Sequence, residues 1–342
     1  MISQFTASRT TALLLLAAAA SPWAGPAEAQ DQPFRGKTIS LFIGFGPGGT
    51  YDYYARLVAR FLGQHIPGSP TIVAAQMPGA GSFTCANFLF SVAPKDGTAI
   101  GIVTQTVAIE EALKTPGVLY KSAQFNWIGR ATSVVETQFT FGNSKTRTME
   151  DATRLETVMG TTGAGSPTEG YPKLLNATYG TRFKLVGPYP ASLDAMIAAE
   201  RGEVDGTLTT YQTIRTARPD WVRDKKVHIL VQYSTKRTAE LPDVPAFTEL
   251  GRTDFDRRML EFYVSAEQVG RSFLAPPGVP ADRVAILRTA FDDMLKDPAL
   301  LAEIAKAKAE FTPLSGALLQ KQIEDVANVS PEIISRMQAV LR

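Results

Sequence analysis

The stretch TISLFIGFGPGGTYDYYARLVARFL, residues 38–62, decides the fold class. Its first part, 38–45, is almost continuously apolar and rich in β-formers, which is typical of a strand buried on both faces. A Gly-Pro-Gly-Gly turn follows at 46–49, and apolar residues then recur at helical spacing over 51–62. The pattern predicts a buried strand that runs through a glycine turn directly into an amphipathic helix.

The alternation of strand and helix continues beyond this stretch. TIVAA (71–75) and AIGIVT (99–104) have the composition of strands, and a glycine turn and a predicted helix, 83–92, lie between them. The order βαβαβ with short crossovers predicts a parallel sheet with helices on both faces. We expect Cys85 to lie buried on the predicted helix as a small apolar residue.

A second α/β unit is expected to begin near Glu136. Further strands are predicted at 157–161, 184–186, 204–208 and 228–233, with helices through 175 and over 192–201. The last third is predicted to be helical, because Asp297-Pro298 and Ser330-Pro331 both have the form of a helix start. The fold class is therefore α/β.

Composition narrows the possible functions. The 342 residues leave room for two domains, and 35 Lys and Arg against 33 Asp and Glu give a net charge of +2 without a dense basic block. A nucleic-acid partner is therefore not expected. One Cys and two His leave neither a disulfide framework nor a Cys/His zinc cluster, so no metal is expected.

Residues 1–29 have the pattern of a secretory signal peptide. Arg9 precedes an apolar run, 12–20, and Ala27-Glu28-Ala29 ends the segment, which predicts cleavage before Gln30. The alternative is a membrane anchor, but this run is shorter than the roughly 20 apolar residues that a span requires. The remainder of the chain is expected to be exported and soluble.

The first glycine turn also satisfies G-x-G-x-x-G over residues 44–49, the fingerprint of a dinucleotide site. That site requires an acidic residue about 20 positions further on, where this chain has Ala74, Ala75 and Gln76. Pro47 also removes one backbone N–H from the turn. We therefore expect no dinucleotide and no cofactor.

Two glycine loops instead predict an anion site. The first glycine loop, 46–49, and the second glycine loop, 163–166, each connect a predicted strand to a predicted helix. Glycine allows close approach to a ligand, and a helix N-terminus presents free N–H groups. Facing each other across a cleft, the loops would bind a small anion, aided by the hydroxyls of Thr50, Ser166 and Thr168. Asp52 would either cap its helix or accept a cationic group of the ligand.

An exported enzyme using Ser166 or Asp52 is the main alternative. A nucleophile elbow requires G-x-S-x-G, and the chain has Gly163-Ala164-Gly165-Ser166-Pro167. His65 follows the first helix and His228 opens a predicted strand, so neither is placed as a general base for Ser166. Binding without chemistry is the favoured interpretation.

An ordered set of motifs resembles one family. FGPGGTYD (45–52) followed by Ala55-Arg56 resembles the F-x-P-G-G-x-x-D-x-x-A-R signature of the Bug family, the TctC-like extracytoplasmic receptors of tripartite tricarboxylate transporters. Further motifs of that family are matched, in the family's order, by PGAG (78–81), PKDGT (94–98), GAGS (163–166), GEVD (202–205), LPDVP (241–245) and APPGVP (275–280). The resemblance covers about residues 35–320.

The resemblance implies a periplasmic-binding-protein type II fold, with two Rossmann-like lobes, a hinge and an interlobe ligand cleft. Lobe 1 would comprise 30–135 and 260–342, and lobe 2 would comprise 136–259. The expected ligand is a small organic acid, and the expected partners are the membrane subunits of a tripartite carrier. The chain would be a monomer in the periplasm; a sensor that signals to a membrane kinase is a further alternative.

The resemblance also implies where the ligand binds. By position, the binding residues are expected at Pro47, Gly48, Gly49, Thr50 and Asp52, at Thr104, Gln105 and Thr106, and at Gly165, Ser166, Pro167 and Thr168. A β-branched residue at Gly48 or Gly49 is expected to intrude on the anion site. Tyr51 and Tyr211 would either line the pocket or pack between helix and sheet.

The chain also departs from the family. Gln76-Met77 replaces the usual Asn-Arg pair, and Thr209 stands where relatives often have an Asp. A cleft without that carboxylate is expected to disfavour cationic or amino-bearing ligands.

Overall fold

The computed structural model describes residues 1–2, 32–326 and 329–341. One compact unit extends from Pro33 to Arg342. The predicted signal segment, apart from its first two residues, lies outside the described residues. Within those described ranges, no helix is both long and apolar enough to cross a membrane.

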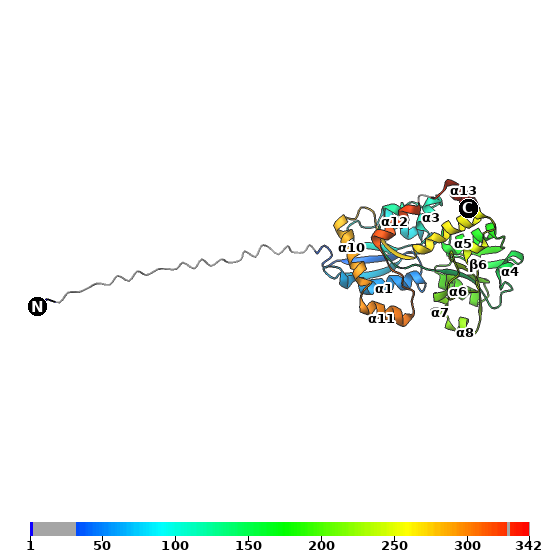
Figure 1. Ribbon diagram of the computed structural model, residues 1–342, viewed down its shortest axis with the longest axis horizontal. Helices are drawn as coiled ribbons and strands as arrows, with labels where there is room; N and C mark the ends of the chain where they lie inside the picture. The colour runs from blue at the N-terminus through cyan, green and yellow to red at the C-terminus, as the bar shows by residue number, and fades with distance from the viewer. Residues whose placement is uncertain (3–31, 327–328, 342) are drawn as a thin grey trace. The chain divides into compact units, whose positions relative to one another are not determined.

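A six-stranded sheet organises the first lobe (Figure 1), and its strand order is β11-β4-β10-β3-β1-β2. The strands are β1 (Thr38–Ile43), β2 (Thr71–Gln76), β3 (Ala99–Ile102), β4 (Asn126–Thr132), β10 (Arg271–Ala275) and β11 (Leu314–Ser315). β1 pairs in parallel with β2 and β3, as the βαβαβ pattern predicts, whereas β10 is antiparallel to β3 and β4. The predicted strands 38–45, 71–75 and 99–104 are thus confirmed.

A five-stranded sheet organises the second lobe, in the order β7-β6-β8-β5-β9. Its strands are β5 (Glu136–Phe141), β6 (Thr157–Gly160), β7 (Phe183–Val186), β8 (Gly206–Thr210) and β9 (Val227–Tyr233). β5 lies antiparallel to both β8 and β9. Its sequence, ETQFTF, carries no apolar run, so the sequence analysis did not predict it as a strand.

The helices cover both sheets. They are α1 (Thr50–His65), α2 (Phe83–Ser91), α3 (Val107–Ala112), α4 (Met149–Arg154), α5 (Pro167–Thr178), α6 (Ser192–Glu200), α7 (Tyr211–Ala217), α8 (Pro219–Arg223), α9 (Asp254–Val264), α10 (Ala281–Met294), α11 (Pro298–Ala307), α12 (Gly316–Val326) and α13 (Pro331–Leu341). The predicted start at Asp297-Pro298 is confirmed, because the Asp297 carboxylate accepts the backbone N–H of Ala299 at 2.8 Å.

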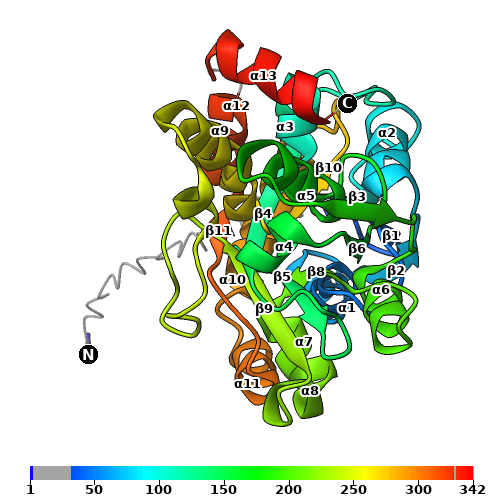
Figure 2. The same ribbon diagram turned by 90° about the vertical axis from the view of Figure 1, so that its right-hand side faces the viewer.

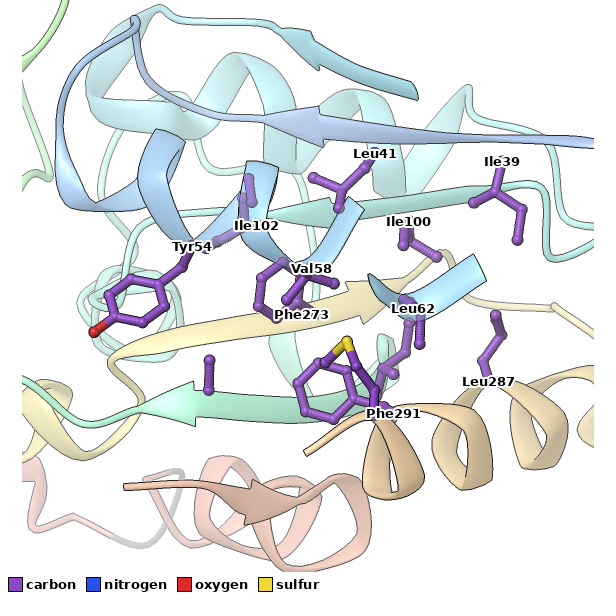
Figure 3. Packing of buried hydrophobic residues seen from close by; sticks show 14 of the residues in the cluster. Ile39, Leu41, Tyr54, Val58, Leu62, Ile100, Ile102, Phe273, Leu287 and Phe291 are labelled. Carbon is purple, nitrogen blue, oxygen red and sulfur yellow. The ribbon is translucent and has the colours of Figure 1, made fainter. Parts of the chain in front are cut away.

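The first-lobe core forms between α1, the sheet and α10 (Figure 3). Tyr54, Val58 and Leu62 recur every four residues on one face of α1 and are buried. They lie in one cluster with Ile102 of β3 and Phe291 of α10. Burial of a side chain of this size stabilises a fold by about 2 kcal/mol. Cys85 is fully buried on α2, as predicted, and burial raises its pKa to about 12.

The second-lobe core includes the C-terminal helix. Ile333 and Met337 of α13 are buried in one cluster with Leu174 of α5 and Tyr263 of α9. Figure 2 shows α13 beside α9, although its residues fall in the range 260–342 predicted for lobe 1.

Two crossings run side by side between the lobes. One joins β4 to β5 through residues 133–135, and the other is the short helix η4 (Ser265–Gln268), which leads into β10. The backbone N–H of Val134 donates to the carbonyl of Glu267 at 3.1 Å, which holds the crossings together. This arrangement brings the first residue of β5 and the first residue of β10 to the boundary between the lobes.

Candidate functional site

A cavity of about 40 Å³ lies between the two lobes. A space of this size holds a few water-sized groups. It is lined by Phe45, Gly49, Thr50, Tyr51 and Arg271 of the first lobe, and by Glu136, Thr162, Pro167, Thr168, Ala191, Ser192, Leu208 and Thr209 of the second. A second hollow of about 210 Å³ shares Gly49 and Thr50 with it and extends toward Gln212 and Thr213 of α7.

Three helices begin at this cavity. The first residues of α1, α5 and α6 are Thr50, Pro167 and Ser192, and all three line it. The first N–H groups of a helix have no partner within the helix, and the helix dipole places positive charge there. The sequence analysis predicted the first two of these starts as ligand sites and missed the third. The convergence of three helix N-termini favours binding of an anion in this cavity.

The start of α5 is built from hydroxyl groups. Thr168 Oγ1 accepts the backbone N–H of Thr162 at 2.8 Å and lies 2.7 Å from Ser166 Oγ. Ser166 Oγ also donates to the carbonyl of Gly163 at 2.7 Å, and its side chain is fully buried. These are its partners among the described residues, and none of them is a base that would activate a serine nucleophile.

Asp52 caps the first glycine loop. Its carboxylate accepts the backbone N–H of Gly48 at 3.1 Å, Nε of Arg56 at 2.8 Å and Nε2 of Gln76 at 2.9 Å. The N-cap residue of α1 is Gly49, which has no side-chain cap, so Asp52 fastens the loop before the helix and does not cap the helix itself. Its predicted contact with a cationic group of the ligand stays a prediction. Asp52 does not line the interlobe cavity.

The loop after β3 lies behind the cavity. The backbone N–H of Thr104 donates to Ser82 Oγ at 3.1 Å, and the hydroxyl of Thr106 donates across the lobes to the carbonyl of Gly165 at 2.6 Å. Gln105 donates through Nε2 to Glu267 at 2.8 Å. These three predicted positions connect other groups and do not line the cavity.

Arg271 and Glu136 form the floor of the cavity, and the sequence analysis missed both. Arg271 Nη2 lies 2.8 Å from Glu136 Oε1, with side-chain exposures of 1% and 6%. Arg271 also donates through Nε to Thr50 Oγ1 at 2.9 Å and through Nη1 to Gln105. Glu136 supplies a carboxylate to a cleft that was expected to lack one at Thr209.

Tyr51 holds the guanidinium from one side. The carbon Cζ of Arg271 lies 4.0 Å from the centre of the Tyr51 ring, and that ring stacks on Phe45 at 4.4 Å. Its hydroxyl donates to Gln105 Oε1 at 3.0 Å. Burial raises the pKa of Tyr51 to about 12, so the hydroxyl keeps its proton at neutral pH.

Glu267 is a second buried carboxyl behind this floor. Burial raises its pKa well above the usual value, and the nearby charge of Glu136 raises it further. Tyr171 and Gln105 both donate to its Oε1. Both burial and the charge of Glu136 therefore favour the protonated form of Glu267.

The remaining predicted positions lie around the cavity. Pro47 and Gly48 are exposed, and Gly48 borders the 210 Å³ hollow. Gly165 borders a rear pocket of about 280 Å³, which is also lined by Glu110, Glu169 and Lys173. Tyr211, the first residue of α7, packs against the cluster that contains Trp221 of α8, and Cζ of Arg215 lies 5.3 Å from the centre of its ring.

Each glycine loop contacts the opposite lobe. The backbone N–H of Gly46 donates to the carbonyl of Pro190 at 2.9 Å. A Cβ added at Gly48 would lie 2.5 Å from Leu193 Cδ2. A Cβ added at Gly165 would lie 2.0 Å from the Phe83 ring. A side chain at Gly48, which was expected to intrude on the anion site, would thus meet Leu193 of the opposite lobe.

Among the described residues, no group of three or more His, Cys, Asp or Glu side chains is placed to hold a metal. The polar groups at the cavity are backbone N–H groups, hydroxyls and a single ion pair. These groups are suited to binding a small polar molecule.

Two α/β lobes with paired crossings and a cavity between them define the two-lobe class of binding proteins. The structure is similar to the periplasmic binding protein BugD (TM-score 0.71, 19% identity, covering 89% of this chain and 98% of that one). It is also similar to MatC of Rhodopseudomonas palustris with bound malate (TM-score 0.68, 20% identity, covering 89% and 99%).

The chain belongs to the TctC family, the tripartite tricarboxylate transporter family receptors, whose family model matches residues 55–339. A curated relative, the "UPF0065 protein in the TAR-I ttuE-ttuC' intergenic region" of Agrobacterium vitis, is 28% identical over 312 residues, which is 89% of this chain and 82% of that protein. The family is one of solute receptors and not of enzymes, so the alternative of a hydrolase acting through Ser166 or Asp52 is set aside.

Proposed function

We propose that this protein is a periplasmic receptor that captures a small carboxylate between its lobes and delivers it, as a monomer, to the membrane subunits of a tripartite tricarboxylate-type carrier. The observation that carries the proposal is the convergence of three helix N-termini on one interlobe cavity. Malate bound to the structurally similar MatC supports a carboxylate ligand.

Thr50 is a specific contact for the carboxylate. Its Oγ1 already accepts a hydrogen bond from Arg271 Nε at 2.9 Å, so its own proton is free to donate. The residue borders both the cavity and the adjoining hollow. A hydroxyl that donates to a charged acceptor contributes about 1.5–3 kcal/mol.

Thermal-shift screening and calorimetric titration with a library of C3–C6 carboxylates, each paired with its neutral amide, test the proposal. A carboxylate is expected to raise the melting temperature and to be recovered unchanged, whereas its fully amidated partner is not expected to bind. Thr50→Val should weaken the tightest carboxylate about tenfold or more. Thr71→Val, at the exposed first residue of β2, is the matched control.

Failure of every carboxylate to bind would overturn the proposal, and so would chemical conversion of the one that binds. Uptake of the labelled ligand by vesicles that contain the carrier's membrane subunits, with and without this protein, tests the partnership. A transcriptional response in place of uptake would support the sensor alternative.

A further inference from the structure

The floor of the cavity holds one cation and one anion. Arg271 and Glu136 are the only charged side chains among the described residues that line the cavity, and they pair at 2.8 Å. Both are buried, at 1% and 4% residue exposure. The ion pair therefore contributes no net charge to the site.

The pair still offers an open acceptor. Each of the three nitrogens of Arg271 already donates once, to Thr50, Gln105 and Glu136. Glu136 Oε2 accepts no hydrogen bond from any described residue, and the side chain borders the cavity. A carboxylate oxygen can only accept, so a ligand group that reaches it must donate.

The helix N-termini supply enough positive charge for one ligand carboxylate but not for two. Each of the three helix N-termini carries a partial charge of roughly +0.5, so together they supply roughly +1.5. A second carboxylate on the ligand would face Glu136 and find no unpaired cation in the cavity. Burying an uncompensated charge is strongly unfavourable, because the charge loses its hydration without gaining a partner.

We propose that Glu136, held by Arg271, makes this receptor select an acid with one carboxylate and one hydrogen-bond donor, such as a hydroxyl, amide or ammonium group, over the dicarboxylate of equal length. This inference rests on the proposed function, because it assumes that one carboxylate binds at the helix N-termini. It assigns the ligand's other end to Glu136 Oε2.

Matched pairs of acids from three to six carbons test the proposal. For four carbons they are succinate against 4-hydroxybutanoate, 4-aminobutanoate and succinamate, each titrated calorimetrically into the wild-type protein. At the chain length that binds most tightly, the acid that carries a hydrogen-bond donor is expected to bind at least tenfold more tightly than the dicarboxylate, which corresponds to about 1.4 kcal/mol. Equal or tighter binding of the dicarboxylate would overturn the selectivity and leave the proposed function standing. Absence of binding by all acids would overturn both.

Glu136→Gln assigns the selectivity to this carboxylate. The amide removes the negative charge and frees Arg271, so the preference for the donor-bearing acid should fall at least tenfold, mainly through tighter binding of the dicarboxylate. Glu110→Gln, at another buried carboxyl that lies outside the cavity, should leave the preference unchanged. An unchanged preference in Glu136→Gln would refute the assignment, and the wild-type titrations decide the selectivity if this variant does not fold.

Discussion

The two glycine loops look alike in the sequence and have different surroundings in the fold. The first glycine loop, 46–49, is partly exposed and meets the flexible tip of Leu193. The second glycine loop, 163–166, meets the ring of Phe83, which is 2% exposed. The same strand–glycine–helix pattern therefore makes a tolerant contact at Gly48 and a tight contact at Gly165.

The acidic groups next to the loops differ in the same way. Asp52 accepts hydrogen bonds from a backbone N–H, an arginine and a glutamine. Glu110, across the rear pocket from Gly165, is 3% exposed and accepts from the hydroxyl of Thr115 at 2.6 Å. The sequence of a loop therefore specifies its backbone conformation. Whether the loop accepts a larger side chain, and which charged group lies beside it, depends on the residues of the elements packed against it.

Gly165→Ala compared with Gly48→Ala is expected to show the largest difference between the loops. Both glycines have left-handed φ angles, 76° and 87°, so alanine costs each about 1 kcal/mol of unfolding free energy. Only in Gly165→Ala would the new methyl group also clash with a buried ring of the other lobe, that of Phe83. This overlap costs about 1–3 kcal/mol when the lobes meet.

Urea unfolding and ligand titration separate these two effects. Gly165→Ala should weaken the tightest-binding carboxylate about tenfold or more, and Gly48→Ala should weaken it only slightly, because the end of Leu193 can move aside. Equal affinities in the two variants would mean that the contact with Phe83 does not limit closure of the lobes.

The pH dependence of stability probes the carboxyl beside the second loop. Burial raises the pKa of Glu110 to about 7, and the charge of Glu169 adds to that shift. The folded state binds a proton that the unfolded state loses near its usual pKa of 4.5. The contribution of Glu110 is therefore fully present below pH 4.5 and is lost as the pH rises to about 7, a fall of about 3 kcal/mol.

Unfolding free energies of the wild type and Glu110→Gln, measured from pH 4 to 8, test this contribution. The difference between the two curves should slope between pH 4.5 and 7 and be flat above. A flat difference throughout would show that Glu110 is already charged in the folded protein. The wild-type curve should fall further than this difference, because burial also raises the pKa of Glu310 to about 7.

The smallest expected effect separates the cap of the first loop from its ion pair. Asp52→Asn weakens the hydrogen bond to the N–H of Gly48 and removes negative charge from the first turn of α1, at a cost of about 1 kcal/mol of unfolding free energy. Arg56→Gln removes only a half-exposed ion pair, which costs about 0.3 kcal/mol. If both variants lost the same stability, the ion pair and not the cap would hold the loop.

The local parts of the fold could be predicted from the sequence. The strand, glycine turn and helix over 38–62 can be predicted because the apolar residues are continuous before the turn and recur at helical spacing after it. β5 could not be predicted, because Thr137, Gln138 and Thr140 are fully buried yet polar. Their burial depends on hydrogen bonds to neighbouring strands and side chains, which no local pattern encodes.

The sequence by itself determined the α/β class, the two glycine loops and the family signature, because each depends on residues close together in the chain. The floor of the cavity was decided by the tertiary structure alone. Glu136 and Arg271 lie 135 positions apart and stand at the first residues of two different strands. Charged residues at strand ends are usually exposed. Here the two interlobe crossings run side by side and bury both together, so each becomes the partner that makes the other's burial possible.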